Sequence, residues 1–291
     1  MDPAIVEGIE RIRKDRAHGA AWLSQQAIGV MKLAAEKSEA EGVAQFLEEL
    51  SEVAGKLIEA RPSMSSIANL VSRFVYDVSR KSREENDLEV LRSFACFTGD
   101  ELIKDSVAAA FKAAEAGAGI IEDGDRLMTC SYSSTVCQAF RMAKNGGKEI
   151  EVIALDSESH GEATAQELRS YGISVEVVPD DALKEHISRA RKVLVGADSI
   201  LGDGSLINGT PTYELAAAAR RTSVPFYSVC ESVKLDARSH RPKLEKGFDL
   251  VPPQLIAGII TEKGLIKPDD IIDHMKGMER YIFLPGQRKG K

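Results

Sequence analysis

The chain has 291 residues, of which 43% are hydrophobic and 29% are charged, and its formal net charge is −7. This composition allows one large domain or two ordinary ones with a sizeable core, and it excludes a disordered polyampholyte. The acidic balance argues against broad binding to nucleic acid or anionic membranes. No apolar run approaches the ~18–20 residues of a membrane span, and the N-terminal segment MDPAIVEGIERIRKDR lacks the apolar core of a secretion signal. Four cysteines without a C-x-x-C pair predict reduced thiols in a cytoplasmic protein without a metal site.

Apolar residues recur at helical spacing throughout residues 1–118. Ile5, Ile9 and Ile12 follow one another at i, i+4 and i+7, and a second stripe runs from Phe46 to Leu57. Two prolines, Pro3 and Pro62, mark places near helix starts. We therefore expect an all-helical domain over residues 1–118.

From Gly119 onward, short apolar runs alternate with helical segments. Runs that are apolar throughout, separated by helices of ~10–15 residues, are typical of a parallel sheet covered on both faces. The sequence thus predicts a Rossmann-like, doubly wound, mostly parallel α/β domain over residues 119–291. The five runs that we expect to form strands are 126–130, 149–155, 174–178, 192–197 and 225–230.

The loops that follow these strands carry the candidate chemistry, because an open α/β sheet binds ligands at the carboxyl ends of its strands. The loop 129–135 is rich in small hydroxyl side chains and leads into a helix, which suits a phosphate group or a plain helix cap. Asp198 follows the fourth run, where partial burial would raise its pKa toward the range used for proton transfer. The alternative for Asp198 is a turn cap or a partner for a cation.

Three further loops stay open to two interpretations each. Asn208 would hydrogen-bond a ligand or close its turn, and Glu231 with Lys234 would bind a polar ligand or pair with one another. The acidic loop 156–162 would hold a cation or lie in solvent. A dinucleotide site at 202–204 is disfavoured, because no third glycine follows at the required offset.

Taken together, these loops resemble a family that contains the α, β and δ regulatory subunits of eukaryotic translation initiation factor 2B. The same family includes isomerases of methylthioribose 1-phosphate and of ribose 1,5-bisphosphate. The resemblance covers nearly the whole chain. The segments that carry it are HGA (18–20), RPSMSSIANLV (61–71), TCSYSSTV (129–136), ELRSYGISVEVV (167–178), GADSILGDGSLINGTPTYELA (196–216), VPFYSVCESVK (224–234) and FDLVPPQLIAGIITEKG (248–264).

The resemblance implies a catalytic pair, a cysteine and an aspartate, in the isomerases. Asp198 matches the aspartate, but Ser131 stands at the position of the cysteine and Cys130 lies one residue before it. A shift of one residue on an extended strand end turns a side chain to the opposite face. Cys130 is therefore expected to point away from the ligand and Ser131 to face it.

The resemblance also implies a ligand-binding set, in which several cationic groups of the isomerases are missing. His18 replaces an arginine, Asn208-Gly209-Thr210 lacks the family lysine, and Ser159-His160 replaces an arginine-containing loop after Glu158. Each lost cation would have contributed a charge-assisted hydrogen bond to a phosphate or hydroxyl group. The implied ligand-binding residues are His18, Gly19, Ala20, Arg61, Ser133, Ser134, Glu158, Asn208, Glu231 and Lys234.

Two functions follow from this pattern. The first is a regulatory protein of the initiation factor 2B type, which binds a phosphorylated small molecule (a sugar phosphate or a nucleotide) and has a translation initiation GTPase as its partner. The second is an aldose–ketose isomerase of a ribose-1-phosphate-type sugar, with Asp198 as general acid/base and Ser131 or Cys130 as its partner. Both need no cofactor, and the resemblance implies a homodimer or hexamer assembled through the α/β domain.

Overall fold

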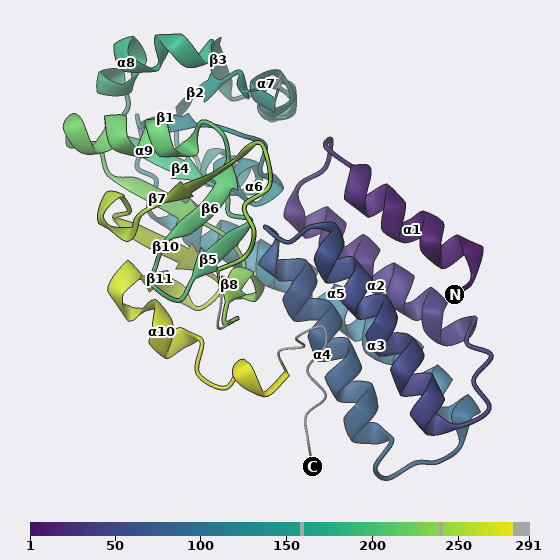
Figure 1. Cartoon of the computed structure of the whole chain (residues 1–291). Coiled ribbons are helices and arrows are strands. Elements are labelled where there is room, and N and C mark those ends of the chain that lie inside the picture. The colour runs from purple at the N-terminus through teal and green to yellow at the C-terminus, as the bar shows by residue number, and fades with distance from the viewer. Residues whose placement is uncertain (158–159, 239–240, 282–291) are drawn as a thin grey trace. The chain divides into compact units, whose positions relative to one another are not determined.

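The computed structural model of the chain describes residues 1–157, 160–238 and 241–281, which form two compact units (Figure 1). The helical unit comprises Met1–Val107 with the described parts of Ala237–Lys243 and Gly277–Lys291. The sheet unit comprises Ala108–Asp236 and Leu244–Lys276. The secondary structure changes from helix to alternating strands and helices after Gly119, as the sequence predicts. The division at residues 118/119 stays a prediction as a domain boundary.

Five helices account for the first 119 residues. They are α1 (Pro3–Lys14), α2 (Ala20–Glu36), α3 (Val43–Ala60), α4 (Ser65–Lys81) and α5 (Leu88–Gly119). Asp2 caps α1 by accepting a hydrogen bond from the Ala4 backbone N–H at 2.8 Å, and Pro3 occupies the first turn, where its missing N–H costs nothing. The other proline, Pro62, lies in the short connection between α3 and α4.

The predicted apolar stripes form the core of the helical unit. Ile5, Ile9 and Ile12 are buried on one side of α1, and Phe46 and Leu50 are fully buried on α3. The helical periodicity therefore identifies the inward faces of these two helices correctly.

The larger sheet of the sheet unit has seven strands in the order β11-β10-β7-β4-β1-β2-β3. Its neighbouring strands are parallel except for the antiparallel β10–β11 pair at one edge. The strands are β1 (Arg126–Thr129), β2 (Glu151–Leu155), β3 (Ser174–Val178), β4 (Lys192–Val195), β7 (Phe226–Val229), β10 (Gly258–Thr261) and β11 (Gly264–Ile266). All five predicted strands are present, and the fold class is the predicted mostly parallel α/β sheet.

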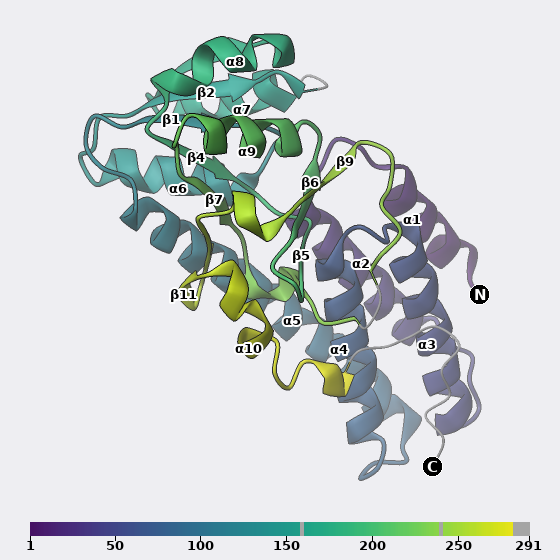
Figure 2. The ribbon, with the colours of Figure 1, turned by 60° about the vertical axis from the view of Figure 1, so that its left-hand side comes forward.

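A second sheet, which the sequence analysis did not predict, lies in the same unit (Figure 2). Its order is β8-β5-β6-β9, and its members are β5 (Ser199–Leu201), β6 (Leu206–Gly209), β8 (Leu235–Asp236) and β9 (Phe248–Val251). The segment after Asp198 is therefore a hairpin and not only a loop, with a turn at Gly204 that has a φ of 80°. These strands have two to four residues and lack the longer apolar runs that mark the predicted strands of the larger sheet.

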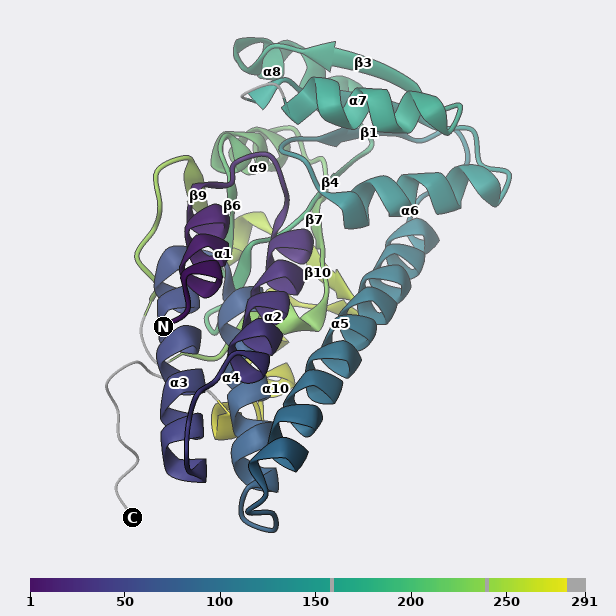
Figure 3. The same cartoon turned by 90° about the vertical axis from the view of Figure 1, so that its right-hand side faces the viewer.

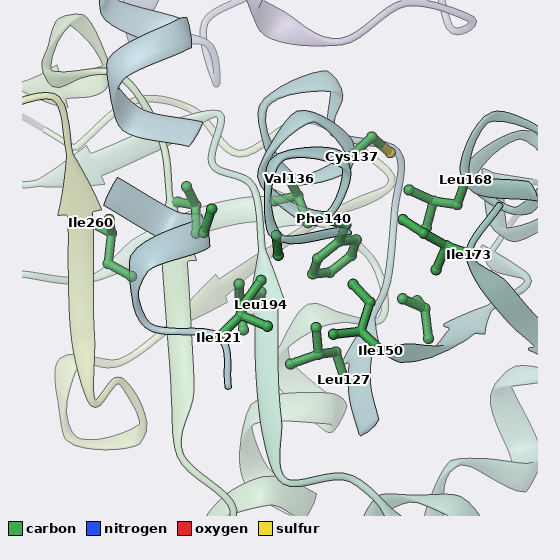
Figure 4. Close-up of a cluster of buried hydrophobic side chains, with 14 residues drawn as sticks. Ile121, Leu127, Val136, Cys137, Phe140, Ile150, Leu168, Ile173, Leu194 and Ile260 are labelled. Carbon is green, nitrogen blue, oxygen red and sulfur yellow. The ribbon is translucent and has the colours of Figure 1, made fainter. Parts of the chain in front are cut away.

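Helices cover the larger sheet and complete the unit. They are α6 (Ser134–Asn145), α7 (His160–Ser170), α8 (Leu183–His186), α9 (Thr212–Arg221) and α10 (Ile271–His274), with short 3₁₀ turns that include Ser232–Lys234. Phe140 of α6 lies among Leu127, Val136 and Ile150 in the core of this unit (Figure 4). Phe226 of β7 is buried as well. Within the described part of the chain, no helix has the length and apolar character to cross a membrane.

Candidate functional site

Three neighbouring strands of the larger sheet, β7, β4 and β1, end in the loops that the sequence singles out. Cys130 and Ser131 follow β1, Asp198 comes just after β4, and Glu231 follows β7. Carboxyl ends of adjacent parallel strands meet at one edge of a sheet, so these loops lie side by side. The sheet unit alone thus brings together eight of the predicted site residues: Cys130, Ser131, Ser133, Ser134, Asp198, Asn208, Glu231 and Lys234.

Cys130 is held in a neutral hydrogen-bond network. Its Sγ lies 3.3 Å from Thr212 Oγ1, and Asn208 Nδ2 donates to the same oxygen at 3.0 Å. Thr212 gives its only proton to the Gly209 carbonyl, so the Cys130 thiol must act as the donor in its contact. Cys130 is 1% exposed, and burial raises its pKa to about 12. The thiol is thus protonated and inert near neutral pH.

The loop that contains Ser131 passes very close to two glycines. Ser131 has a φ of 58°, a conformation that L residues rarely adopt, and it is half-buried. A Cβ atom at Gly209 would lie 2.8 Å from Ser131 Oγ, and one at Gly196 would lie 2.6 Å from Ser133 Oγ. Both glycines therefore leave room for the hydroxyl-rich loop, which explains why the ends of β4 and β6 carry residues without side chains.

Ser133 also has a structural role. It is the N-cap of α6, and its Oγ accepts a hydrogen bond from the Val136 backbone N–H at 3.4 Å. Ser134 is the first residue of this helix and is exposed. The cap interpretation of the hydroxyl loop is thus present in the structure, while the helix N-terminus keeps the positive dipole end that attracts anions.

A buried ionic cluster follows β7. Lys234 Nζ lies 3.0 Å from Glu231 Oε2, and Thr135 Oγ1 donates to Glu231 Oε1 at 3.0 Å. Burial opposes the charged form of Glu231, but the Lys234 ammonium outweighs it, and the pKa of this carboxyl lies below its usual value. Burial likewise opposes the charge on Lys234, yet Glu231 and, more weakly, Asp198 hold its pKa above the usual value. The Glu231–Lys234 pairing that the spacing allowed is therefore present.

Asp198 follows β4, the strand between β1 and β7 in the larger sheet. It is 9% exposed, and its backbone N–H donates to the Ile207 carbonyl at 2.9 Å, which ties the end of β4 to the hairpin strand β6. Its carboxylate also contributes to the field at Lys234. The structure thus places Asp198 as a largely buried carboxylate beside a buried cation.

The site residues predicted in the helical unit form a group of their own around Asp15. His18 Nδ1 lies 2.8 Å from Asp15 Oδ2, and the His18 ring stacks on Trp22 with centroids 3.9 Å apart. Arg61 is 3% exposed and donates from Nη1 to the Asp15 carbonyl at 2.9 Å. Gly19 is the N-cap of α2 and Ala20 its first residue. The ligand-binding role expected for these residues stays a prediction.

Glu158 and the possible metal ligands are the remaining parts of the predicted site. Glu158 lies outside the described residues, so its role as a ligand-binding residue stays a prediction. Among the residues that the structure does describe, no group of three histidine, cysteine, aspartate or glutamate side chains could hold a metal ion.

Sequence reasoning missed two threonines that organise this edge of the sheet. Thr212 is fully buried and joins Cys130, Asn208 and the Gly209 carbonyl, and the buried Thr135 bonds Glu231. Thr212 is the first residue of α9 and directly follows Pro211, which occupies the N-cap. A threonine in a first helical turn is so common that nothing in the sequence marks it as the centre of a network.

The chain is similar to known proteins over almost its whole length. It is 31% identical to the ribose 1,5-bisphosphate isomerase of Pyrococcus furiosus, and the match covers 96% of this chain and 95% of the relative. It is 32% identical to the putative translation initiation factor eIF-2B subunit 2-like protein of Pyrococcus abyssi, over 91% and 96% of the two chains. The structure of the translation initiation factor eIF-2B from Pyrococcus horikoshii matches 94% of this chain and 100% of its own, with a TM-score of 0.81 and 28% identity.

These similarities agree with the motifs at the strand ends, and they include relatives of both predicted functional types. The family match itself extends over residues 16–245, which contain all of the predicted site residues. The chain therefore belongs to the Initiation factor 2 subunit family.

Proposed function

We propose that this chain is a regulatory-type initiation factor 2B-like protein that binds a phosphorylated small molecule at the carboxyl ends of β1, β4 and β7. The observation that carries the proposal is the state of Cys130. The thiol is buried, its pKa is raised to about 12, and its proton is committed to Thr212. A thiol of this kind does not exchange protons with a substrate near neutral pH.

The position next to it supports the same proposal. Ser131 is half-buried in the same loop, but a hydroxyl is a far weaker acid than a thiol and needs a nearby base to act in catalysis. Glu231, the carboxylate that follows β7, is already paired with Lys234. The loop therefore offers hydroxyl groups and a helix N-terminus, which suit recognition of a phosphate group better than proton transfer.

The loop that contains Asn208 also supports the proposal. The side-chain amide of Asn208 donates to Thr212, and the segment Asn208-Gly209-Thr210 lacks the lysine that the family isomerases carry in this loop. Gly209 leaves room for the Ser131 side chain, because a Cβ atom at position 209 would lie 2.8 Å from Ser131 Oγ. The loop is thus built around the hydroxyl of Ser131 instead of a cation, and this favours a ligand with fewer charges than a doubly phosphorylated sugar.

A specific observation keeps the isomerase as the second candidate. Asp198 is a largely buried carboxylate that follows β4, and it interacts electrostatically with Lys234. It matches the aspartate of the family enzymes. The relative from Pyrococcus furiosus is named an isomerase of ribose 1,5-bisphosphate. In that function Asp198 would move the proton, with Ser131 as its partner.

Calorimetric titration with ribose 1,5-bisphosphate, methylthioribose 1-phosphate and a nucleoside monophosphate separates the two functions. We expect at least one of them to bind, with no conversion of either sugar phosphate detected by ³¹P NMR. Conversion that Asp198→Asn abolishes, while binding stays within about tenfold, would establish the isomerase instead. Binding of none of the three compounds would contradict the proposal.

The proposed partner is a translation initiation GTPase, and the proposed assembly is a homodimer or hexamer. Pull-down of the purified GTPase by the full-length chain, with and without the ligand found by calorimetry, tests the partner directly. Absence of any complex at micromolar concentrations of both proteins would remove the translational role and leave only the ligand-binding one.

A further inference from the structure

The side chain of Glu167 connects the loop after β1 to helix α7. Its Oε2 accepts a hydrogen bond from the Tyr132 hydroxyl at 2.8 Å, and its Oε1 accepts one from the Tyr171 hydroxyl at 2.9 Å. All three residues belong to the sheet unit, and all three are half-buried. Hydrogen bonds to an ionised group are stronger than those between neutral groups. Both oxygens of this carboxylate are therefore engaged, one of them by the loop that carries Ser131.

Arg141 of α6 adds a cation to this cluster. The helices α6 and α7 pack against one another in the sheet unit (Figure 3). The guanidinium carbon of Arg141 lies 5.2 Å from the centre of the Tyr171 ring, which is a cation–π distance. Burial and the bond to Glu167 raise the pKa of Tyr132 and of Tyr171 above the usual value. Both phenols therefore keep their protons near neutral pH and act as the donors to Glu167.

Ser131 lies between two anchored neighbours. Its φ of 58° is in the left-handed region, which is unfavourable for a residue with a side chain. On one side the Cys130 thiol bonds Thr212, and on the other side the Tyr132 hydroxyl bonds Glu167. A strained backbone conformation persists only where the surrounding contacts enforce it. The shape of the loop thus depends on both anchors.

We propose that Glu167 is a positioning residue of the ligand site, which holds the hydroxyl loop after β1 in its phosphate-binding shape through Tyr132. This inference rests on the proposed function, because that function assigns phosphate recognition to the same loop. Glu167 acts through geometry and not through contact with the ligand, since a carboxylate repels a phosphate group. Without the Tyr132 hydroxyl, the backbone of Ser131 relaxes toward an ordinary φ, and its side chain leaves the space beside Gly209.

A thiol at position 131 reports on the shape of the loop without any ligand. In a full-length Cys96→Ser/Ser131→Cys background, the rate of reaction with Ellman's reagent at pH 8 measures the opening of the loop. Tyr132→Phe removes the hydroxyl that anchors the loop, and Tyr171→Phe is the matched control, because it removes the other hydroxyl bound to Glu167. We expect the thiol to react at least about fivefold faster in Tyr132→Phe than in Tyr171→Phe. A smaller difference would overturn the proposal.

Cys230 separates local opening from unfolding of the whole sheet unit. It is fully buried after β7, so it is labelled only where the fold around it opens. Peptide mass spectrometry assigns the label to each thiol. Fast labelling at position 131 with an unlabelled Cys230 is the expected result for Tyr132→Phe. Labelling of both thiols at the same rate would show that the tyrosine only stabilises the fold, and it would overturn the proposal.

A double-variant cycle tests whether Glu167 acts through Tyr132. Glu167→Leu removes both acceptors, and we expect it to speed the reaction at position 131 as Tyr132→Phe does. If the two residues form one unit, the double variant reacts within about twofold of the faster single variant. A larger increase would show that the two residues act independently and would overturn the positioning role of Glu167.

Ligand binding provides the last test, in chains that keep Ser131. Tyr132→Phe and Tyr171→Phe are titrated by calorimetry with ribose 1,5-bisphosphate, methylthioribose 1-phosphate and a nucleoside monophosphate. Each compound that the wild type binds is expected to bind Tyr132→Phe at least about fivefold more weakly than Tyr171→Phe. A smaller difference would overturn the proposal. A wild type that binds none of the three compounds contradicts the proposed function, whereas thiol labelling still decides whether Glu167 holds the loop.

Discussion

The loops after β1 and β7 both begin with a buried cysteine, but one is held by neutral hydrogen bonds and the other by a buried ion pair. Each starts with a buried cysteine, Cys130 or Cys230, whose pKa burial raises to about 12. The loop after β1 then builds a neutral network on Thr212, whereas the loop after β7 buries the charged pair Glu231–Lys234. The same edge of the sheet therefore carries two kinds of network. The Thr212 network is neutral and insensitive to pH, whereas the Glu231–Lys234 pair depends on ionisation. The two loops are therefore expected to respond differently to the loss of a charge, to the loss of a hydroxyl group, to pH and to thiol reagents.

Removal of one charge from the ionic loop is expected to have the largest effect. Lys234→Met leaves Glu231 as a buried carboxylate without its cation, and we expect it to cost about 3–5 kcal/mol in the free energy of unfolding. Urea denaturation followed by circular dichroism measures this change. The control is Glu231→Gln with Lys234→Met, which removes both charges and is expected to recover most of the loss. A single variant as stable as the wild type would mean that the pair does not hold this loop.

Removal of the shared hydroxyl from the neutral loop is expected to have a smaller effect. Thr212→Val keeps the shape of the side chain but leaves the Gly209 carbonyl and the Asn208 amide without their partner, at a cost of about 1–3 kcal/mol. Thr212→Ser keeps the hydroxyl and is the matched control, with an expected loss well below that of valine. Equal losses for serine and valine would show that packing of the methyl group, and not the network, stabilises this loop.

The pH dependence of stability distinguishes the two loops without breaking either. The pKa of Glu231 lies below its usual 4.5, so its contribution is present above that value and is lost as the pH falls through the folded-state pKa. The pKa of Lys234 lies above its usual 10.5, so its contribution is present below that value and is lost as the pH rises through the folded-state pKa. We therefore expect the difference in free energy of unfolding between the wild type and the double variant Glu231→Gln/Lys234→Met to be constant between about pH 5 and about pH 10 and to shrink outside this range.

The matched control is the neutral loop. The difference in free energy of unfolding between the wild type and Thr212→Val is expected not to change with pH. A Thr212→Val difference that follows pH would contradict the neutral character assigned to its loop.

The contrast between the loops also explains which parts of the site the sequence reveals. Glu231 and Lys234 stand three positions apart, and this spacing alone suggested their pairing. Asp198 was found because it follows an apolar run, and the end of a buried strand can be read from composition. Cys130 was singled out by the family resemblance, because it lies one residue before the position of the catalytic cysteine. Thr212 could not be found, because its role depends on the turn that brings Asn208 and Gly209 back beside the loop after β1. That turn belongs to the short hairpin of β5 and β6, whose strands are too brief to leave a periodic signal. The larger sheet, in contrast, was predictable because five of its strands, β1, β2, β3, β4 and β7, lie in short apolar runs that alternate with helical segments along the chain.

Thiol reactivity is expected to show the smallest change, and it bears most directly on function. Of the four cysteines, Cys130, Cys137 and Cys230 are buried, and Cys96 is half-buried with a pKa that burial and Glu36 raise. We expect Ellman's reagent at pH 8 to label Cys96 slowly in the folded protein and all four thiols in urea. Ser131→Cys is expected to add a second reactive thiol, because this position is half-buried and has no part in the Thr212 network. Rapid labelling of a second thiol in the wild type, lost in Cys130→Ser, would mean that the loop after β1 opens and exposes Cys130. In that case the thiol would be available beside Asp198, and the balance between the two functions would move toward the isomerase.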